Sequence, residues 1–127
     1  MYRVVINDKF SSAHFLRNYK GKCENLHGHN YLVEVYVISK VLNDSEMVID
    51  FTELKKITKD ILNQIDHFLL NDIDFFKSHN PTSENIAYYI FSKINEKIKD
   101  NLNNIILEKV RVWETDQQYA EYFINES

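Results

Sequence analysis

The feature that most constrains the fold is the alternation of polar and apolar residues along residues 27–39, HGHNYLVEVYVIS. From residue 31 onward one parity is wholly apolar and consists of Tyr31, Val33, Val35 and Val37. Successive side chains of a strand point to opposite faces of its sheet, so this alternation predicts a half-buried strand with odd-numbered residues toward the core. His27 and His29 share that parity and are expected to point inward.

A preceding strand is predicted over residues 2–16, with an interruption near Asn7. Its inward parity comprises Val4, Ile6, Phe10, Ser12 and His14. The polar residues 17–26 predict a loop between the two strands. Because this connection is short, a hairpin is favoured, and it would bring His14 beside the two histidines of the other strand.

Two amphipathic helices are predicted after these strands. Asp50 is a candidate N-cap with Glu53 as its capping partner, and the first helix is expected to end at about Gln64. Pro81 is expected to begin the second helix, with Glu84 in its first turn. The apolar stripes of the two helices consist of Leu54, Ile57, Ile61 and Ile65 in the first and Ile86, Ile90, Ile94 and Ile98 in the second.

Residues 105–114 predict a third strand, and residues 119–124 predict a short fourth one. Strands come in pairs instead of alternating with helices, which predicts a single α+β domain over residues 1–127 with an antiparallel four-stranded sheet. Two helices can cover one face of such a sheet. Because the strands are rich in apolar residues, the other face is expected to be covered by self-association.

The net charge of −4 argues against nucleic acid or an anionic membrane as the main partner, since both require a basic surface. No apolar run approaches the length of a membrane span, and the first residues lack the pattern of a signal peptide. A cytoplasmic protein is therefore expected. Cys23 is the only cysteine, so it cannot form an internal disulfide and is expected to be a free thiol.

His14, His27 and His29 form the candidate metal site. Histidines two residues apart on a strand project from the same face, and three converging imidazoles suit zinc with a fourth position left for water or substrate. Gly28 between two of them allows close approach of the backbone. Cys23, separated from His27 by three residues, is either a fourth ligand or a group that performs chemistry beside the metal.

Three other titratable side chains are candidates with two interpretations each. The pair Asp66 and His67 follows the first helix, where His67 either interacts with the helix dipole or acts as an acid/base group with its carboxylate partner. Glu114 has the parity of the inward valines before it, so it is either a buried ligand anchor or a strand-end carboxylate turned to water. His79 is expected to be solvated.

Six segments occur in an order that resembles one family. They are FSSAHFL, a cysteine shortly before HGHNY, MVIDFTELK, IDHFLLND, NPTSENIA and VRVWET. They span nearly the whole chain and resemble the 6-pyruvoyl-tetrahydropterin synthase/6-carboxytetrahydropterin synthase family. The resemblance implies the tunnelling (T) fold, in which subunits join their sheets into a barrel. It also implies a homohexamer of two stacked trimers with active sites between subunits.

The resemblance also implies roles for the candidate residues. Zinc would be held by His14, His27 and His29, and the thiol of Cys23 would be the proton acceptor. Asp66 and His67 would assist that thiol. Glu114 would anchor the pterin ring of the substrate, and further pterin contacts would come from Thr82, Ser83 and Glu84.

The substrate implied by the resemblance is 7,8-dihydroneopterin triphosphate. The short spacing from Cys23 to His27 resembles the carboxy branch, which forms 6-carboxytetrahydropterin for queuosine-type biosynthesis and releases acetaldehyde and triphosphate. The alternatives are the pyruvoyl branch, which eliminates only triphosphate, and a zinc-stabilised oligomer that binds pterins without turnover. The basic residues Arg17, Lys20 and Lys22 would meet the triphosphate or form a solvated loop. Glu24 is a second candidate base beside Cys23.

Overall fold

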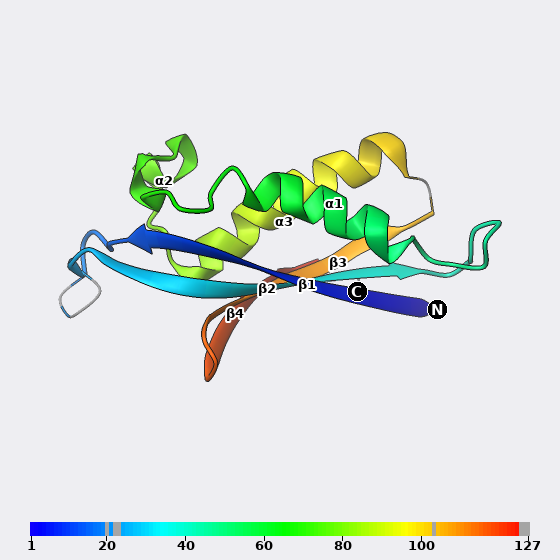
Figure 1. Ribbon diagram of the computed structural model, residues 1–127, viewed down its shortest axis with the longest axis horizontal. Helices are drawn as coiled ribbons and strands as arrows, with labels where there is room; N and C mark the ends of the chain where they lie inside the picture. Colours follow the sequence, from blue (N-terminus) through cyan, green and yellow to red (C-terminus); the bar gives the residue numbers. More distant parts are fainter. Residues whose placement is uncertain (20, 22–23, 103, 125–127) are drawn as a thin grey trace.

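The computed structural model describes residues 1–19, 21, 24–102 and 104–124. Its frame is one antiparallel sheet in the order β1-β2-β3-β4, with helices on one face (Figure 1). The strands are β1 (Tyr2–His14), β2 (His27–Ser39), β3 (Ile106–Thr115) and β4 (Gln118–Phe123). This arrangement confirms the α+β prediction with a four-stranded sheet. None of the helices in the described residues is long and apolar enough to cross a membrane.

The register of β1 against β2 is continuous from the pair Tyr2 and Ser39 to the pair His14 and His27. The predicted parity is confirmed, because the inward side chains are buried: Ile6, Phe10, Tyr31, Val33, Val35 and Val37. The expected interruption near Asn7 is wrong. Asp8 has the inward parity, and Lys59 of the covering helix contacts its carboxylate at 2.9 Å, so the strand continues past it.

The two predicted helices are α1 (Phe51–Leu62) and α3 (Ser83–Asn101). Asp50 caps α1 by accepting the N–H of Thr52 at 2.8 Å. The helix α3 begins two residues later than predicted, because Thr82 is extended and caps it by accepting the N–H of Asn85 at 3.1 Å. Both apolar stripes face the sheet, with α1 packed on β1 and α3 on β3 and β4.

Two short elements between the long helices were not predicted, namely η2 (Leu70–Asp72) and α2 (Asp74–Ser78). They are too short to show a helical period. The chain before them runs along the free edge of β1, where His67 N–H donates to Ser11 O at 2.6 Å and Ala13 N–H donates to Phe68 O at 3.1 Å. Backbone hydrogen bonds to β1 therefore hold the segment around His67 and Phe68, whose sequence has no helical or strand periodicity.

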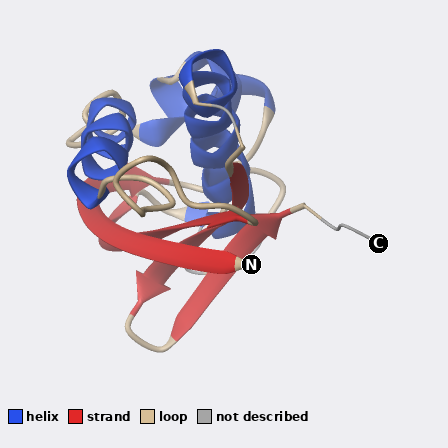
Figure 2. Cartoon of the chain, turned by 90° about the vertical axis from the view of Figure 1, so that its right-hand side faces the viewer, coloured by secondary structure: helices blue, strands red, loops and turns tan. Residues whose placement is uncertain are grey.

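The face of the sheet opposite the helices is not covered by any of the residues that the structure describes (Figure 2). Its centre is a network of charged and aromatic side chains. Arg111 Nε contacts a Glu121 oxygen at 2.8 Å, and Trp113 Nε1 donates to Glu34 at 2.5 Å. The guanidinium of Arg111 also lies 4.2 Å from the ring centroid of Tyr119. This face is polar at its centre, although aromatic side chains contribute much of its area.

The stripe of α3 gives a test of the packing. Ile90 is fully buried against the sheet, so Ile90→Ala should lower the free energy of unfolding by about 2–5 kcal/mol through lost contacts and a residual cavity. Ile57→Ala is the matched control, because Ile57 on α1 is only partly buried and should cost less. Thermal and denaturant unfolding measure both variants. Equal losses in the two would contradict the assigned core.

Candidate metal centre and adjoining pocket

Three histidines meet where β1 ends and β2 begins. The register places His14 opposite His27, and it places His29 two residues further along the same face. The ring centroids lie 4.5 to 5.3 Å apart, and one nitrogen from each ring lies within 4.8 Å of the others. The sequence-based expectation that these side chains converge is confirmed, and the cluster is positioned to hold a metal ion.

Backbone carbonyls determine which ring nitrogens face the centre of this cluster. Pro81 O lies 2.7 Å from Nδ1 of His14, and Asn25 O lies 2.7 Å from Nδ1 of His27. A carbonyl oxygen only accepts, so each Nδ1 must carry the ring proton. In the neutral rings Nε2 is then the atom with the free lone pair, and the two Nε2 atoms lie 3.0 Å apart. Such lone pairs repel each other unless a cation lies between them.

The third ring, that of His29, also has a nitrogen that a metal ion could bind. Nε2 of His29 is buried and has no hydrogen-bond partner among the residues that the structure describes. Burial is the main cause that lowers the pKa of both His14 and His29, opposed at His14 by the Pro81 carbonyl and at His29 by Glu114. The neutral form that ligates metals is thereby favoured. Three neutral imidazole nitrogens within 4.8 Å of one another are a donor set that could hold a metal ion.

Tyr31 closes the inner side of the cluster. Its hydroxyl lies 3.3 Å from Nδ1 of His14, and its ring stacks on Phe10 with centroids 4.7 Å apart. Tyr31 is fully buried and His14 is 1% exposed. The cluster thus rests on the hydrophobic core and opens only on the side away from it.

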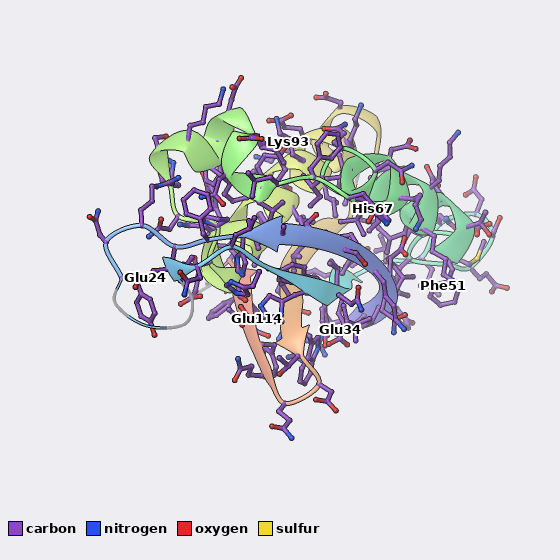
Figure 3. The ribbon with its side chains drawn as sticks, turned by 60° about the vertical axis from the view of Figure 1, so that its left-hand side comes forward. Glu24, Glu34, Phe51, His67, Lys93 and Glu114 are labelled. Atoms are coloured by element: carbon purple, nitrogen blue, oxygen red, sulfur yellow. The ribbon has the colours of Figure 1, made fainter. Side chains whose placement is uncertain are left out.

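A cavity of about 430 Å³ adjoins the cluster. It brings His14 together with all four residues expected to bind substrate; its lining includes Thr82, Ser83, Glu84 and Glu114. Glu114 connects the two parts, since one carboxylate oxygen accepts from Ser83 Oγ at 3.3 Å and the other lies 3.6 Å from Nε2 of His29. The inward orientation predicted for Glu114 is therefore found. Figure 3 labels Glu114, which lies near the end of β3.

The start of α3 forms one wall of this cavity. The wall consists of the capping residue Thr82 and the first turn with Ser83 and Glu84. Tyr19 and Gln118 complete part of the opposite wall. Carboxylate and hydroxyl oxygens accept hydrogen bonds from N–H groups, so the cavity is suited to a flat heterocycle that presents several N–H donors beside the metal centre.

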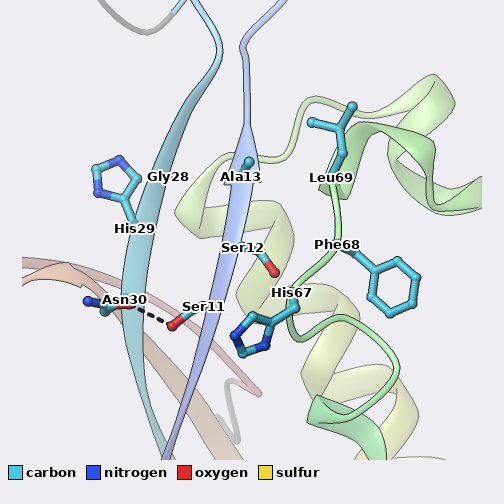
Figure 4. A pocket seen from close by; sticks show the side chains of 9 residues that line it. All are labelled: Ser11, Ser12, Ala13, Gly28, His29, Asn30, His67, Phe68 and Leu69. Atoms are coloured by element: carbon cyan, nitrogen blue, oxygen red, sulfur yellow. Dashed lines mark hydrogen bonds between the residues drawn. The ribbon is translucent and has the colours of Figure 1, made fainter.

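Asp66 and His67 do not line this cavity, although His67 and His29 both line another pocket, of about 470 Å³. His67 Nδ1 contacts Asp66 at 3.0 Å, and its side chain is 81% exposed on the far side of β1 from the ring of His29 (Figure 4). The other Asp66 oxygen accepts the N–H of Ser11 at 2.8 Å, which is the main cause that lowers the Asp66 pKa. The ring of His67 pairs with this carboxylate, and His67 follows Asn63, the C-cap of α1.

The loop before β2 contains the remaining candidates. Cys23, Lys20 and Lys22 lie outside the described residues. Glu24 is exposed in the part of the loop that extends past the sheet (Figure 3). The guanidinium of Arg17 donates to Phe76 O at 2.6 Å, so the structure gives it a structural contact.

No sequence pattern indicates the carbonyls of Pro81 and Asn25 that fix the ring tautomers. Backbone carbonyls carry no residue signature, so only the folded geometry identifies them. His79, expected to be solvated, is exposed and stacks on Phe75 with centroids 4.5 Å apart.

Comparisons with known proteins agree with this geometry. The family model described as 6-pyruvoyl tetrahydropterin synthase matches residues 3–125. An Archaeoglobus fulgidus protein provisionally named 6-carboxy-5,6,7,8-tetrahydropterin synthase is 41% identical over 118 residues, covering 93% of this chain and 92% of its own. A Synechocystis protein with the same name, without the qualifier, is 40% identical and covers 97% and 94%.

A solved structure shares the fold. The 6-pyruvoyl tetrahydropterin synthase of Caenorhabditis elegans superposes with a TM-score of 0.82 at 36% identity, covering 98% of both chains. The sheet with its helices is therefore the T-fold subunit that the sequence motifs implied. From the matching family model, the relatives and the shared fold, the chain belongs to the 6-pyruvoyl tetrahydropterin synthase family.

Proposed function

We propose that the chain is a zinc-dependent 6-carboxy-5,6,7,8-tetrahydropterin synthase. It converts 7,8-dihydroneopterin triphosphate to 6-carboxytetrahydropterin, with release of acetaldehyde and triphosphate, in the cytoplasm and within queuosine-type biosynthesis. The observation that carries this proposal is the three-histidine cluster that opens beside a cavity lined by Glu114, Ser83 and Thr82. Family membership supports the pterin chemistry.

The carboxy branch is preferred for two reasons. Both sequence relatives described above carry the carboxy name, and only three residues separate Cys23 from His27. The name of the Caenorhabditis elegans structure supports the pyruvoyl branch as the alternative. A zinc-stabilised pterin-binding oligomer without turnover is the third possibility, and it differs from the other two by forming no product.

The site residues would divide the work as follows. Zinc held by His14, His27 and His29 would polarise the side-chain hydroxyls of the substrate and ease loss of a proton from the adjacent carbon. Glu114 accepts hydrogen bonds from the N–H groups of the pterin ring, which fixes the ring in the cavity. Cys23 accepts the proton as a thiolate.

The pair of Asp66 and His67 requires a second subunit under this proposal. Within one chain His67 shares a pocket with His29 but does not line the cavity that contains Glu114. In a homohexamer built as a dimer of trimers, the same pair would be presented to the site of a neighbouring subunit. The uncovered face of the sheet supports such an assembly, because joined sheets would enclose it.

One assay tests the proposed reaction. Zinc-loaded protein is incubated with 7,8-dihydroneopterin triphosphate, and acetaldehyde and triphosphate are measured. Release of both supports the carboxy branch. Release of triphosphate alone identifies the pyruvoyl branch, and binding without either product identifies the non-catalytic oligomer.

The metal assignment predicts that His29→Ala loses zinc and activity together. Its buried Nε2 has no hydrogen-bond partner in the described part of the chain, and two remaining imidazoles hold zinc too weakly to survive dialysis. His79→Ala is the matched control, because His79 lies outside the cluster and should keep full occupancy. Elemental analysis measures both. Full zinc occupancy in His29→Ala would exclude the three-histidine site.

The pterin assignment predicts that Glu114→Ala lowers kcat/KM while zinc content and folding persist. The loss of a hydrogen bond to a charged group corresponds to about 1.5–3 kcal/mol, or roughly 10- to 150-fold. Glu121→Ala is a control that removes a carboxylate from the opposite face of the sheet, where it contacts Arg111. An unchanged kcat/KM in Glu114→Ala would disprove the role of Glu114.

The choice between the two roles of Cys23 also has a direct test. As a proton acceptor, Cys23 is not needed to hold zinc, so Cys23→Ala should keep the metal while turnover falls roughly 10²-fold or more. Joint loss of zinc and activity would make Cys23 a ligand. If activity survives, the base lies elsewhere, and Glu24→Ala is the next variant to measure.

A further inference from the structure

The free edge of β1 continues beyond the last residue of the strand. Alternate residues of an extended chain present their N–H and C=O groups to the same edge. Ser11 and Ala13 use this edge to bond the chain that follows α1. Phe15 and Arg17 continue the same parity past His14, although no backbone strand lies beside them in the described part of the chain.

Two asparagine side chains take the place of that missing strand. Asn71 Oδ1 accepts the N–H of Phe15 at 3.0 Å, and its Nδ2 donates to Phe15 O at 3.0 Å. Asn80 repeats the arrangement on Arg17, with bonds of 2.9 Å from the Arg17 N–H and 2.7 Å to Arg17 O. Each amide thus satisfies both backbone groups of one residue, as a neighbouring strand would.

Asn80 differs from Asn71 in what its own backbone holds. Asn80 O accepts from Asn85 Nδ2 at 2.9 Å and from the N–H of Thr82 at 2.8 Å, which ties it to the start of α3. The next carbonyl, Pro81 O, accepts the Nδ1 proton of His14 at 2.7 Å. His14 is therefore connected to Asn80 in two ways. The chain leads from His14 to Arg17, which bonds the Asn80 side chain, and Pro81, the residue after Asn80, bonds the His14 ring.

Asn71 has no comparable connection. It is buried in η2, and its neighbours in sequence line neither the cavity nor the histidine cluster. The two asparagines therefore make the same pair of bonds to the segment after His14, but only one of them is continuous with the wall of the cavity. This difference separates a role in folding from a role at the site.

We propose that Asn80 is a positioning residue for the metal centre. By holding both Arg17 and the Pro81 carbonyl in place, it sets the orientation of the His14 ring. It thereby also sets the position of the metal centre relative to the cavity wall at Thr82 and Ser83. The proposal rests on the metal-binding function proposed above. Partners that orient a ligating histidine through its second nitrogen typically contribute 10- to 100-fold to metal affinity.

The test compares Asn80→Ala with Asn71→Ala. Zinc affinity is measured by competition with a chromophoric chelator, and stability is measured by thermal unfolding. Both variants should lose stability, because each leaves one backbone N–H and one C=O without its side-chain partner. Only Asn80→Ala should also lose zinc affinity, by about 10-fold or more, while Asn71→Ala stays within about threefold of the wild type.

Asn80→Asp is the second variant and serves if Asn80→Ala does not fold. It keeps an acceptor for the Arg17 N–H but replaces the donor to Arg17 O with a carboxylate oxygen, so its zinc affinity should also fall below that of the wild type. Unchanged zinc affinity in the Asn80 variants, or an equal loss in Asn71→Ala, overturns the proposal.

The failure of this proposal is distinguishable from failure of the proposed function. If the wild-type protein binds no zinc, the metal function itself is wrong. If the wild type binds zinc and releases acetaldehyde while Asn80→Ala keeps full affinity, only the positioning role is wrong.

Discussion

The site depends on two hydrogen bonds from imidazole Nδ1 atoms to backbone carbonyls, at Pro81 and Asn25. These bonds direct the Nε2 lone pairs of His14 and His27 toward each other at 3.0 Å. The arrangement also requires the register of β1 and β2, because a slip of one residue would move His27 and His29 to the other face of the sheet. Register and carbonyls together produce a cluster of ring nitrogens that could hold a metal ion.

The parts of the structure that were predictable are those with a period. The alternation in β2 identified the inward face, and the same parity correctly placed His27, His29 and, on β3, Glu114. The isoleucine stripe identified α3, although its start was placed two residues early at Pro81. Periodic signals succeed here because the burial of one face controls which residues occupy it.

The remaining features have no period. The side-chain amides of Asn71 and Asn80 bond backbone groups more than fifty residues away in the sequence. In a sequence, an asparagine indicates only a turn or a cap. The short elements η2 and α2 are held by tertiary contacts. Likewise, sequence adjacency correctly paired Asp66 with His67 but could not show that the ring of His67 lies across β1 from that of His29.

We propose that three imidazoles hold zinc and that Cys23 is not among its ligands. X-ray absorption of the zinc-loaded protein tests this claim most directly, because nitrogen and sulfur neighbours differ in distance and scattering. We expect three imidazole nitrogens and one further light atom at about 2.0–2.1 Å from the zinc ion. A sulfur neighbour at about 2.3 Å would contradict it and would make the thiol a structural ligand.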